Sequence, residues 1–62
     1  MSLKTLIADD EPLARAGLKI LLCEDPEISV IAEARNGIEA AKAIREFLPD
    51  LVFLDVQIWQ CP

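Results

Sequence analysis

Three aspartates have the residue type and the spacing to bind a metal ion. Asp9 and Asp10 follow the apolar run Leu3–Ala8, and Asp55 follows the apolar run Leu51–Leu54. Carboxylates that gather at one place repel one another, and a divalent cation relieves that repulsion. Hard oxygen ligands with room for water favour Mg²⁺ over softer metals. The aspartates are therefore candidate ligands of a magnesium ion.

Asp55 is also a candidate nucleophile. A carboxylate beside a metal with an open coordination position can attack a phosphoryl group and form an acyl phosphate. Asp55 stands alone at the end of its apolar run, which suits a nucleophile. The adjacent Asp9 and Asp10 suit metal binding better, since neighbours in sequence can offer one carboxylate directly and one through water.

Alternating strands and helices are predicted between these acids. Strands are expected at 3–8, 28–34 and 51–54, with helices that begin near Pro12 and Asn36. Such alternation implies an α/β fold with parallel strands and right-handed crossovers. We expect the opening half of a doubly wound sheet in the order 2-1-3, with the two helices on opposite faces.

This strand order would bring the aspartates together. The first and third strands become neighbours, and their carboxyl ends meet at the edge where doubly wound folds bind ligands. Each acidic group taken alone could be structural, because acids commonly cap helices or end strands. The joint placement of Asp9, Asp10 and Asp55 on adjacent strand ends favours a functional site.

The helix faces that should pack on the sheet follow from apolar spacing. Cys23 lies in an apolar run and is expected to be a small core residue. The residues expected to be buried are Leu13, Ala14, Gly17, Leu18 and Leu21 in the first helix, and Ala40, Ala41, Ile44, Phe47 and Leu48 in the second.

Composition excludes several classes of function. The 62 residues allow at most one small domain, and the net charge of −5 argues against electrostatic binding of nucleic acid. No apolar run approaches the ~20 residues of a membrane helix, and the start of the chain lacks the features of a signal peptide. A cytoplasmic protein is therefore expected. Two isolated cysteines and no histidine make a zinc site improbable.

Three stretches closely resemble the receiver domains of response regulators in two-component signalling. They are Asp9-Asp10-Glu11-Pro12-Leu13, Glu33-Ala34 with Asn36-Gly37, and the run from Pro49 to Gln57. The resemblance implies a flavodoxin-like (CheY-like) fold and a phosphoryl group donated by a sensor histidine kinase. It also implies a phosphoacceptor signalling domain with self-phosphorylation chemistry at most, rather than an enzyme.

Particular roles follow from the resemblance. Asp55 matches the phosphoacceptor, Asp9 and Asp10 match the acidic pair that holds Mg²⁺, and Gln57 falls where the family supplies a backbone carbonyl to the metal. The stretches 11–15 and 53–57 look like regulators with a LytTR-type DNA-binding output domain, and regulators with a helix-turn-helix output are also similar. DNA would be bound only through an output domain that is absent from this chain.

The end of the chain departs from the family pattern. After Gln57 the family continues Met-Pro and then a glycine, whereas this chain reads Ile-Trp-Gln-Cys-Pro at 58–62. We therefore predict the N-terminal half of a receiver domain at 3–57 and a tail outside the family pattern at 58–62. The fourth and fifth strands, with the family's Ser/Thr and Lys, would be missing, so phosphorylation should be impaired.

Two alternative functions remain to be weighed. The chain could be a truncated half-domain that signals nothing and folds only by self-association, as a homodimer or a larger assembly. A phosphatase of the haloacid dehalogenase type is disfavoured, because that family has two acids separated by one residue, and Asp9 and Asp10 are adjacent.

Overall fold

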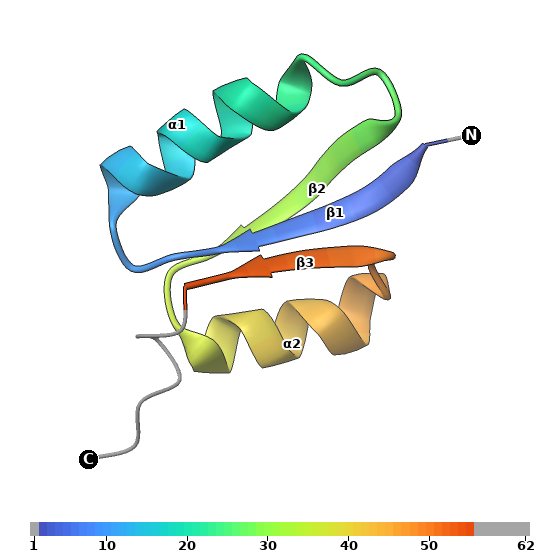
Figure 1. Cartoon of the computed structure of the whole chain (residues 1–62). Helices are drawn as coiled ribbons and strands as arrows, with labels where there is room; N and C mark the ends of the chain where they lie inside the picture. Colours follow the sequence, from blue (N-terminus) through green and yellow to red (C-terminus); the bar gives the residue numbers. More distant parts are fainter. Residues whose placement is uncertain (1, 56–62) are drawn as a thin grey trace.

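Three parallel strands form one sheet in the order β2 (Ile28–Ala34), β1 (Leu3–Ala8), β3 (Leu51–Leu54), with a helix on either side (Figure 1). The computed structural model describes residues 2–55. The predicted α/β fold and strand order are confirmed. The elements are β1 (Leu3–Ala8), α1 (Pro12–Cys23), β2 (Ile28–Ala34), α2 (Gly37–Phe47) and β3 (Leu51–Leu54).

The register of the sheet aligns the carboxyl ends of all three strands. Ala8 of β1 is paired with Ala34 of β2 on one side and with Leu54 of β3 on the other. The central strand is covered on both faces, so its residues 5–8 are almost fully inaccessible to solvent. Parallel strands covered on both faces are expected to be continuously apolar. The residues that follow β1 and β3 therefore emerge side by side.

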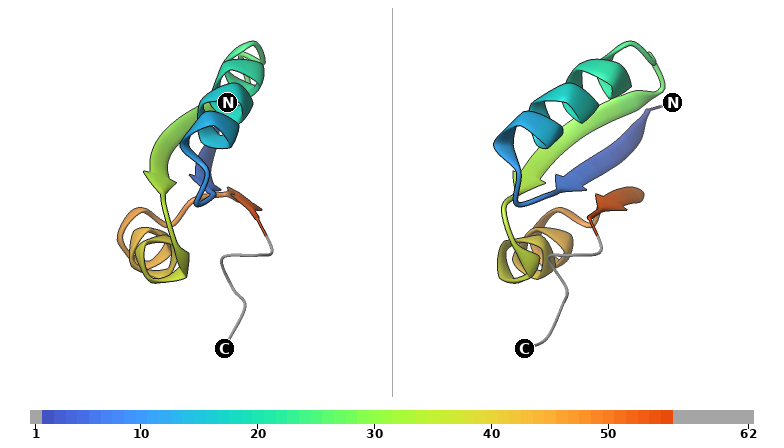
Figure 2. Two further views of the ribbon diagram at one scale, coloured as in Figure 1. Left: turned by 90° about the vertical axis from the view of Figure 1, so that its left-hand side faces the viewer. Right: turned by 60° about the vertical axis from the view of Figure 1, so that its left-hand side comes forward.

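The helix α2 covers one face of the sheet with small residues. Ala40 and Ala43 pack against Leu6, Ala8 and Ala34 in the main core cluster. The two helices lie on opposite faces of the sheet (Figures 1 and 2). Alanine side chains let the helix backbone approach the sheet closely, which makes this contact sensitive to added volume.

The predicted buried face of α2 is only partly correct. Ala40 is buried as expected, but Ala43 was not predicted, and Phe47 and Leu48 are exposed. Leu48 ends the helix in the left-handed conformation, with φ of 48°. Its backbone N–H still donates to the Ile44 carbonyl at 3.0 Å. A left-handed residue at this position ends a helix well, and its side chain then points away from the face that packs.

The predicted buried stripe of α1 is wrong except at Leu18, which is half-buried. Leu13 and Leu21 are 84% and 67% exposed, whereas Leu22 is buried. Arg15 and Leu18 are half-buried and share a face with Leu22, at the spacing of helical neighbours. The helix therefore turns a charged residue toward the sheet in place of the apolar residues at 13 and 21.

Cys23 is exposed, so its predicted place in the core is also wrong. It is the last residue of α1 and directly follows Leu22, which occupies the face toward the sheet. Neither helix in the described part of the chain is long and apolar enough to cross a membrane.

Capping side chains fix the start of α2. Asn36 accepts a hydrogen bond from the Glu39 backbone N–H at 2.8 Å, and the Glu39 carboxylate accepts one from the Arg35 backbone N–H at 2.9 Å. The first contact satisfies a backbone donor of the first turn, and the second satisfies the N–H of the residue before the N-cap. The hydrogen bond from the Arg35 backbone, helped by the Arg35 side chain, lowers the pKa of Glu39 from its ordinary value.

Candidate metal centre

The structure brings the three aspartates of the sequence prediction together. Asp9, Asp10 and Asp55 each offer one carboxylate oxygen, and these oxygens all lie within 4.8 Å of one another. Asp9 and Asp55 are half-buried, and Asp10 is exposed. The cluster thus combines anchored carboxylates with access for solvent. Carboxylate oxygens of this kind, with neither histidine nor cysteine among them, suit a hard cation such as Mg²⁺ that keeps several waters.

Backbone hydrogen bonds continue the sheet into the cluster. The Asp9 N–H donates to the Ala34 carbonyl, and the Asp55 N–H donates to the Ala8 carbonyl, both at 3.0 Å. These contacts extend the strand pairing by one residue beyond each strand end. They fix where the Asp9 and Asp55 backbones lie, so the carboxylates converge because the strands are in register.

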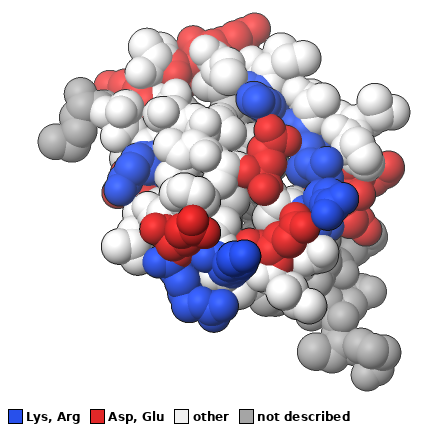
Figure 3. Space-filling view, turned by 180° about the vertical axis from the view of Figure 1, so that it is seen from behind, with Lys and Arg blue, Asp and Glu red and all other residues white. Residues whose placement is uncertain are grey.

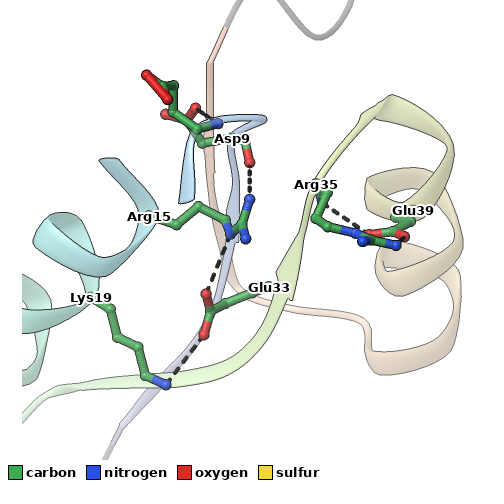
Figure 4. Close-up of polar contacts among 7 residues, drawn as sticks. Asp9, Arg15, Lys19, Glu33, Arg35 and Glu39 are labelled. Atoms are coloured by element: carbon green, nitrogen blue, oxygen red, sulfur yellow. Dashed lines mark hydrogen bonds and ion pairs between the residues drawn. The ribbon is translucent and has the colours of Figure 1, made fainter. Parts of the chain in front are cut away.

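The loop between β1 and α1 is held by two further contacts. The Asp9 carboxylate accepts a hydrogen bond from the Glu11 backbone N–H at 2.9 Å. The Asp9 backbone carbonyl accepts one from the Arg15 guanidinium, at 2.7 Å from Nη1 (Figure 4). One carboxylate oxygen of Asp9 therefore accepts a hydrogen bond within the loop, and the backbone carbonyl of Asp9 accepts one from a side chain of the first turn of α1.

Arg15 is the residue of this region that sequence reasoning missed. Its Nε lies 3.6 Å from a Glu33 carboxylate oxygen, and Lys19 Nζ lies 3.2 Å from the other (Figure 4). The spacing of Arg15 and Lys19 placed them together on one helix face, but the apolar stripe indicated that this face was turned to solvent. The sequence feature that could have indicated this packing is Glu33, an acid in β2 that can pair with both Arg15 and Lys19.

Charges of both signs are interspersed elsewhere on the surface. On the face seen from behind Figure 1, Lys and Arg side chains lie beside Asp and Glu (Figure 3). Arg35 and Glu39 form a surface ion pair with their charged groups 3.1 Å apart. On the face seen in Figure 3, acidic side chains adjoin the basic ones within the described part of the chain.

Gln57, the predicted source of a backbone carbonyl for the metal, lies outside the described residues. The same holds for the predicted tail at 58–62. Both stay predictions.

Comparison with known proteins identifies the family. The family model for the response regulator receiver domain matches residues 5–61. This chain belongs to the response-regulator receiver family. The receiver is a signalling domain of two-component systems, and the resemblance seen in the sequence is thereby confirmed. The match extends past Gln57, and the predicted boundary at that residue stays a prediction.

Relatives named as regulatory proteins match over most of the chain. It is 46% identical over 56 residues to the transcriptional regulatory protein BtsR of Salmonella typhi, covering 90% of this chain and 23% of the relative. An uncharacterized response regulatory protein of Vibrio vulnificus is 50% identical over 58 residues, covering 94% of this chain and 24% of the relative. The chain thus spans about a quarter of the length of these relatives.

A solved receiver structure supports the fold. The signal receiver domain of NarL from Mycobacterium tuberculosis superposes with a TM-score of 0.84 at 33% identity. The alignment covers 87% of this chain and 44% of that chain. The receiver fold predicted from the order of elements is therefore confirmed.

Proposed function

We propose that Asp55 accepts a phosphoryl group from a sensor histidine kinase while Asp9 and Asp10 hold Mg²⁺. The observation that carries this proposal is the set of three carboxylate oxygens within 4.8 Å at the ends of β1 and β3. Membership of the receiver family supports the same assignment. The carbonyl of Gln57 is proposed as a further metal ligand.

The chemistry assigned to Asp55 is nucleophilic. One of its carboxylate oxygens forms a bond to phosphorus, and the bond from phosphorus to the kinase histidine nitrogen breaks. The histidine nitrogen leaves with the bonding electrons and takes up a proton. Mg²⁺ held by Asp9 and Asp10 would supply positive charge that offsets the charge on the transferred phosphoryl oxygens. The Asp55 N–H, bonded to the Ala8 carbonyl, keeps the nucleophile at the strand end.

The setting of this reaction is also proposed. A receiver that takes its phosphoryl group from a histidine kinase acts in the cytoplasm, where the kinase domain and ATP are found. BtsR, one of the similar proteins, is named a transcriptional regulator. We infer that this receiver controls transcription through an output domain, which alone would contact DNA.

Phosphorylation of the 62-residue chain by itself should be slow. The family resemblance assigns a Ser/Thr and a Lys, which contact the phosphoryl group, to strands that would follow β3. Loss of one preorganised contact to a developing charge costs roughly 3 kcal/mol, or about a hundredfold in rate. Asp55 is therefore proposed as a competent but impaired acceptor in this chain.

The test is the intact mass of the purified chain after incubation with acetyl phosphate and Mg²⁺. We expect slow addition of one phosphoryl group, which is absent in Asp55→Asn and in EDTA. Glu27→Gln, an exposed acid in the loop before β2, is the matched control and should label like the wild type. Labelling that persists in Asp55→Asn would refute the assignment, and rapid stoichiometric labelling would refute the impairment.

A second candidate is a half-domain that signals nothing and folds only by self-association. The observation that favours it is β3, which among the described strands pairs with β1 alone. An unpaired strand edge promotes association with another chain. Light scattering separates the candidates, because a folded monomer at micromolar concentration would eliminate this one. Specific phosphorylation of Asp55 would show that the chain has signalling chemistry and would refute that part of the second candidate.

A further inference from the structure

We propose that Arg15 is a positioning residue for the metal centre, which it serves by fixing the peptide bond that joins Asp9 to Asp10. This inference rests on the proposed function, because it assumes that the two carboxylates bind Mg²⁺. It adds a residue outside the carboxylate cluster, and it assigns that residue a role through the backbone rather than through contact with the metal.

The geometry begins with the carbonyl that Arg15 holds. Arg15 Nη1 donates to the Asp9 carbonyl oxygen at 2.7 Å, the distance of a strong charge-assisted hydrogen bond. That carbonyl belongs to the planar peptide between Asp9 and Asp10. Its direction sets ψ of Asp9 and φ of Asp10. The hydrogen bond therefore constrains the relative directions in which the two side chains leave the backbone.

The guanidinium is itself held in place. Its Nε lies 3.6 Å from Glu33, and the Arg15 side chain is only 14% exposed. Lys19 contacts the other oxygen of the same carboxylate at 3.2 Å. Glu33 belongs to β2, so the guanidinium connects the loop between β1 and α1 to the strand beside β1. A planar fork with several donors can contact a carbonyl and a carboxylate together, which a single ammonium cannot do with equal rigidity.

Arg15 also acts on a peptide that the strand pairing leaves unanchored. The Asp9 N–H donates a hydrogen bond to the Ala34 carbonyl, and the Asp9 carboxylate accepts one from the Glu11 N–H. The second of these contacts spans Asp10 and closes a local turn. The hydrogen bond from Arg15 adds a constraint on the carbonyl of the peptide between Asp9 and Asp10, and this carbonyl is not part of that turn contact.

Positioning and simple charge predict opposite effects on metal affinity. A positive charge near a cation site weakens cation binding through Coulomb repulsion. If the charge of Arg15 were its only influence, its removal would tighten Mg²⁺ binding. If Arg15 positions the ligands, its removal weakens binding, because the carboxylates must then be ordered by the metal. The direction of the change therefore identifies the role.

The experiment is a titration of the 62-residue chain with MgCl₂, followed by NMR at the amides of Asp9, Asp10 and Asp55. The variants are Arg15→Gln, which removes the charge, and Arg15→Lys, which keeps the charge and loses the fork. Arg45→Gln, an exposed arginine in the last turn of α2, is the control. Groups that orient metal ligands typically contribute 10–100-fold to affinity, so we expect about tenfold weaker binding in both Arg15 variants. Arg45→Gln should bind like the wild type.

A second readout needs no metal. With EDTA present, the order parameter of the Asp10 amide should fall in Arg15→Gln and stay unchanged in Arg45→Gln. Far-UV circular dichroism checks folding, and Arg15→Lys gives the result if Arg15→Gln unfolds.

Three results would overturn the inference or its premise. Equal or tighter Mg²⁺ binding in Arg15→Gln, or an unchanged Asp10 order parameter, would refute the positioning role. Wild-type affinity in Arg15→Lys would show that a single ammonium donor suffices at this position, and it would refute the role assigned to the guanidinium fork. A wild-type chain whose aspartate amides do not respond to Mg²⁺ would instead refute the proposed function.

Discussion

Replacing Asp10 with asparagine should stabilise the chain without metal and destabilise it, relative to wild type, in saturating Mg²⁺. In the metal-free chain the Asp10 carboxylate has two negatively charged neighbours, Asp9 and Asp55. Asp10 is the best choice of the three because it is exposed, whereas the Asp9 carboxylate also accepts a hydrogen bond from the Glu11 N–H.

The size of the effect follows from the separation of the charges. Two unit charges 4.8 Å apart repel by about 1 kcal/mol at a dielectric constant of about 80, and by about 3.5 kcal/mol at about 20. Because Asp10 is exposed, the lower value applies to each of its two pairs. The free energy of unfolding at pH 7 and low salt should therefore rise by about 1–2 kcal/mol. Salt at about 1 M, with a Debye length of about 3 Å, should remove most of this gain.

Metal reverses the comparison. At a Mg²⁺ concentration ten times the dissociation constant, binding stabilises the wild-type chain by about 1.4 kcal/mol. Asp10→Asn removes a ligand, so it gains less from the metal. The two unfolding curves should approach and then cross as Mg²⁺ is added.

Thermal unfolding followed by circular dichroism measures both effects. For a domain of this size about 1 kcal/mol corresponds to roughly 4–8 °C in Tm. Glu27→Gln changes the net charge equally, from −5 to −4, away from the cluster. If Asp10→Asn gains no more than Glu27→Gln in EDTA, or if Mg²⁺ stabilises it as much as wild type, the carboxylates do not act as a repelling, metal-binding cluster.

Three further outcomes are expected. Leu48→Gly should raise the free energy of unfolding by roughly 0.5–1 kcal/mol in urea titrations, because glycine adopts the left-handed conformation at φ of 48° without strain; a loss would contradict this. Glu39→Gln should make the stability less dependent on acidic pH. The lowered pKa of Glu39 adds stability at pH values above the pKa of the unfolded chain, and this contribution is lost as the pH falls through the folded-state pKa. The Tm values of the wild type and the variant should therefore converge below pH 4.5. Ala43→Leu should cost about 1–3 kcal/mol by overpacking the contact with the sheet, whereas Ala16→Leu, on the exposed side of α1, should cost little.

Much of the site could be predicted because strand ends are visible in sequence. An apolar run that stops at an acid marks both the end of a buried strand and the residue that emerges from it. Once alternation with helices implies parallel strands in the order 2-1-3, Asp9, Asp10 and Asp55 must share one edge. The structure adds the register, in which Ala8 is level with Leu54, and this brings the carboxylate oxygens within 4.8 Å.

The rotation of α1 was decided only by the tertiary structure. Apolar spacing favoured a buried face with Leu13 and Leu21, yet both are exposed and Arg15 faces the sheet. A helix rotates to the position that best satisfies all of its partners, and here a guanidinium finds both the Asp9 carbonyl and the Glu33 carboxylate. Hydrophobic spacing does not include such partners, because they come from other elements. The sequence by itself therefore determined the strand ends and the acids upon them, and the packing of α1 determined how the loop between them is held.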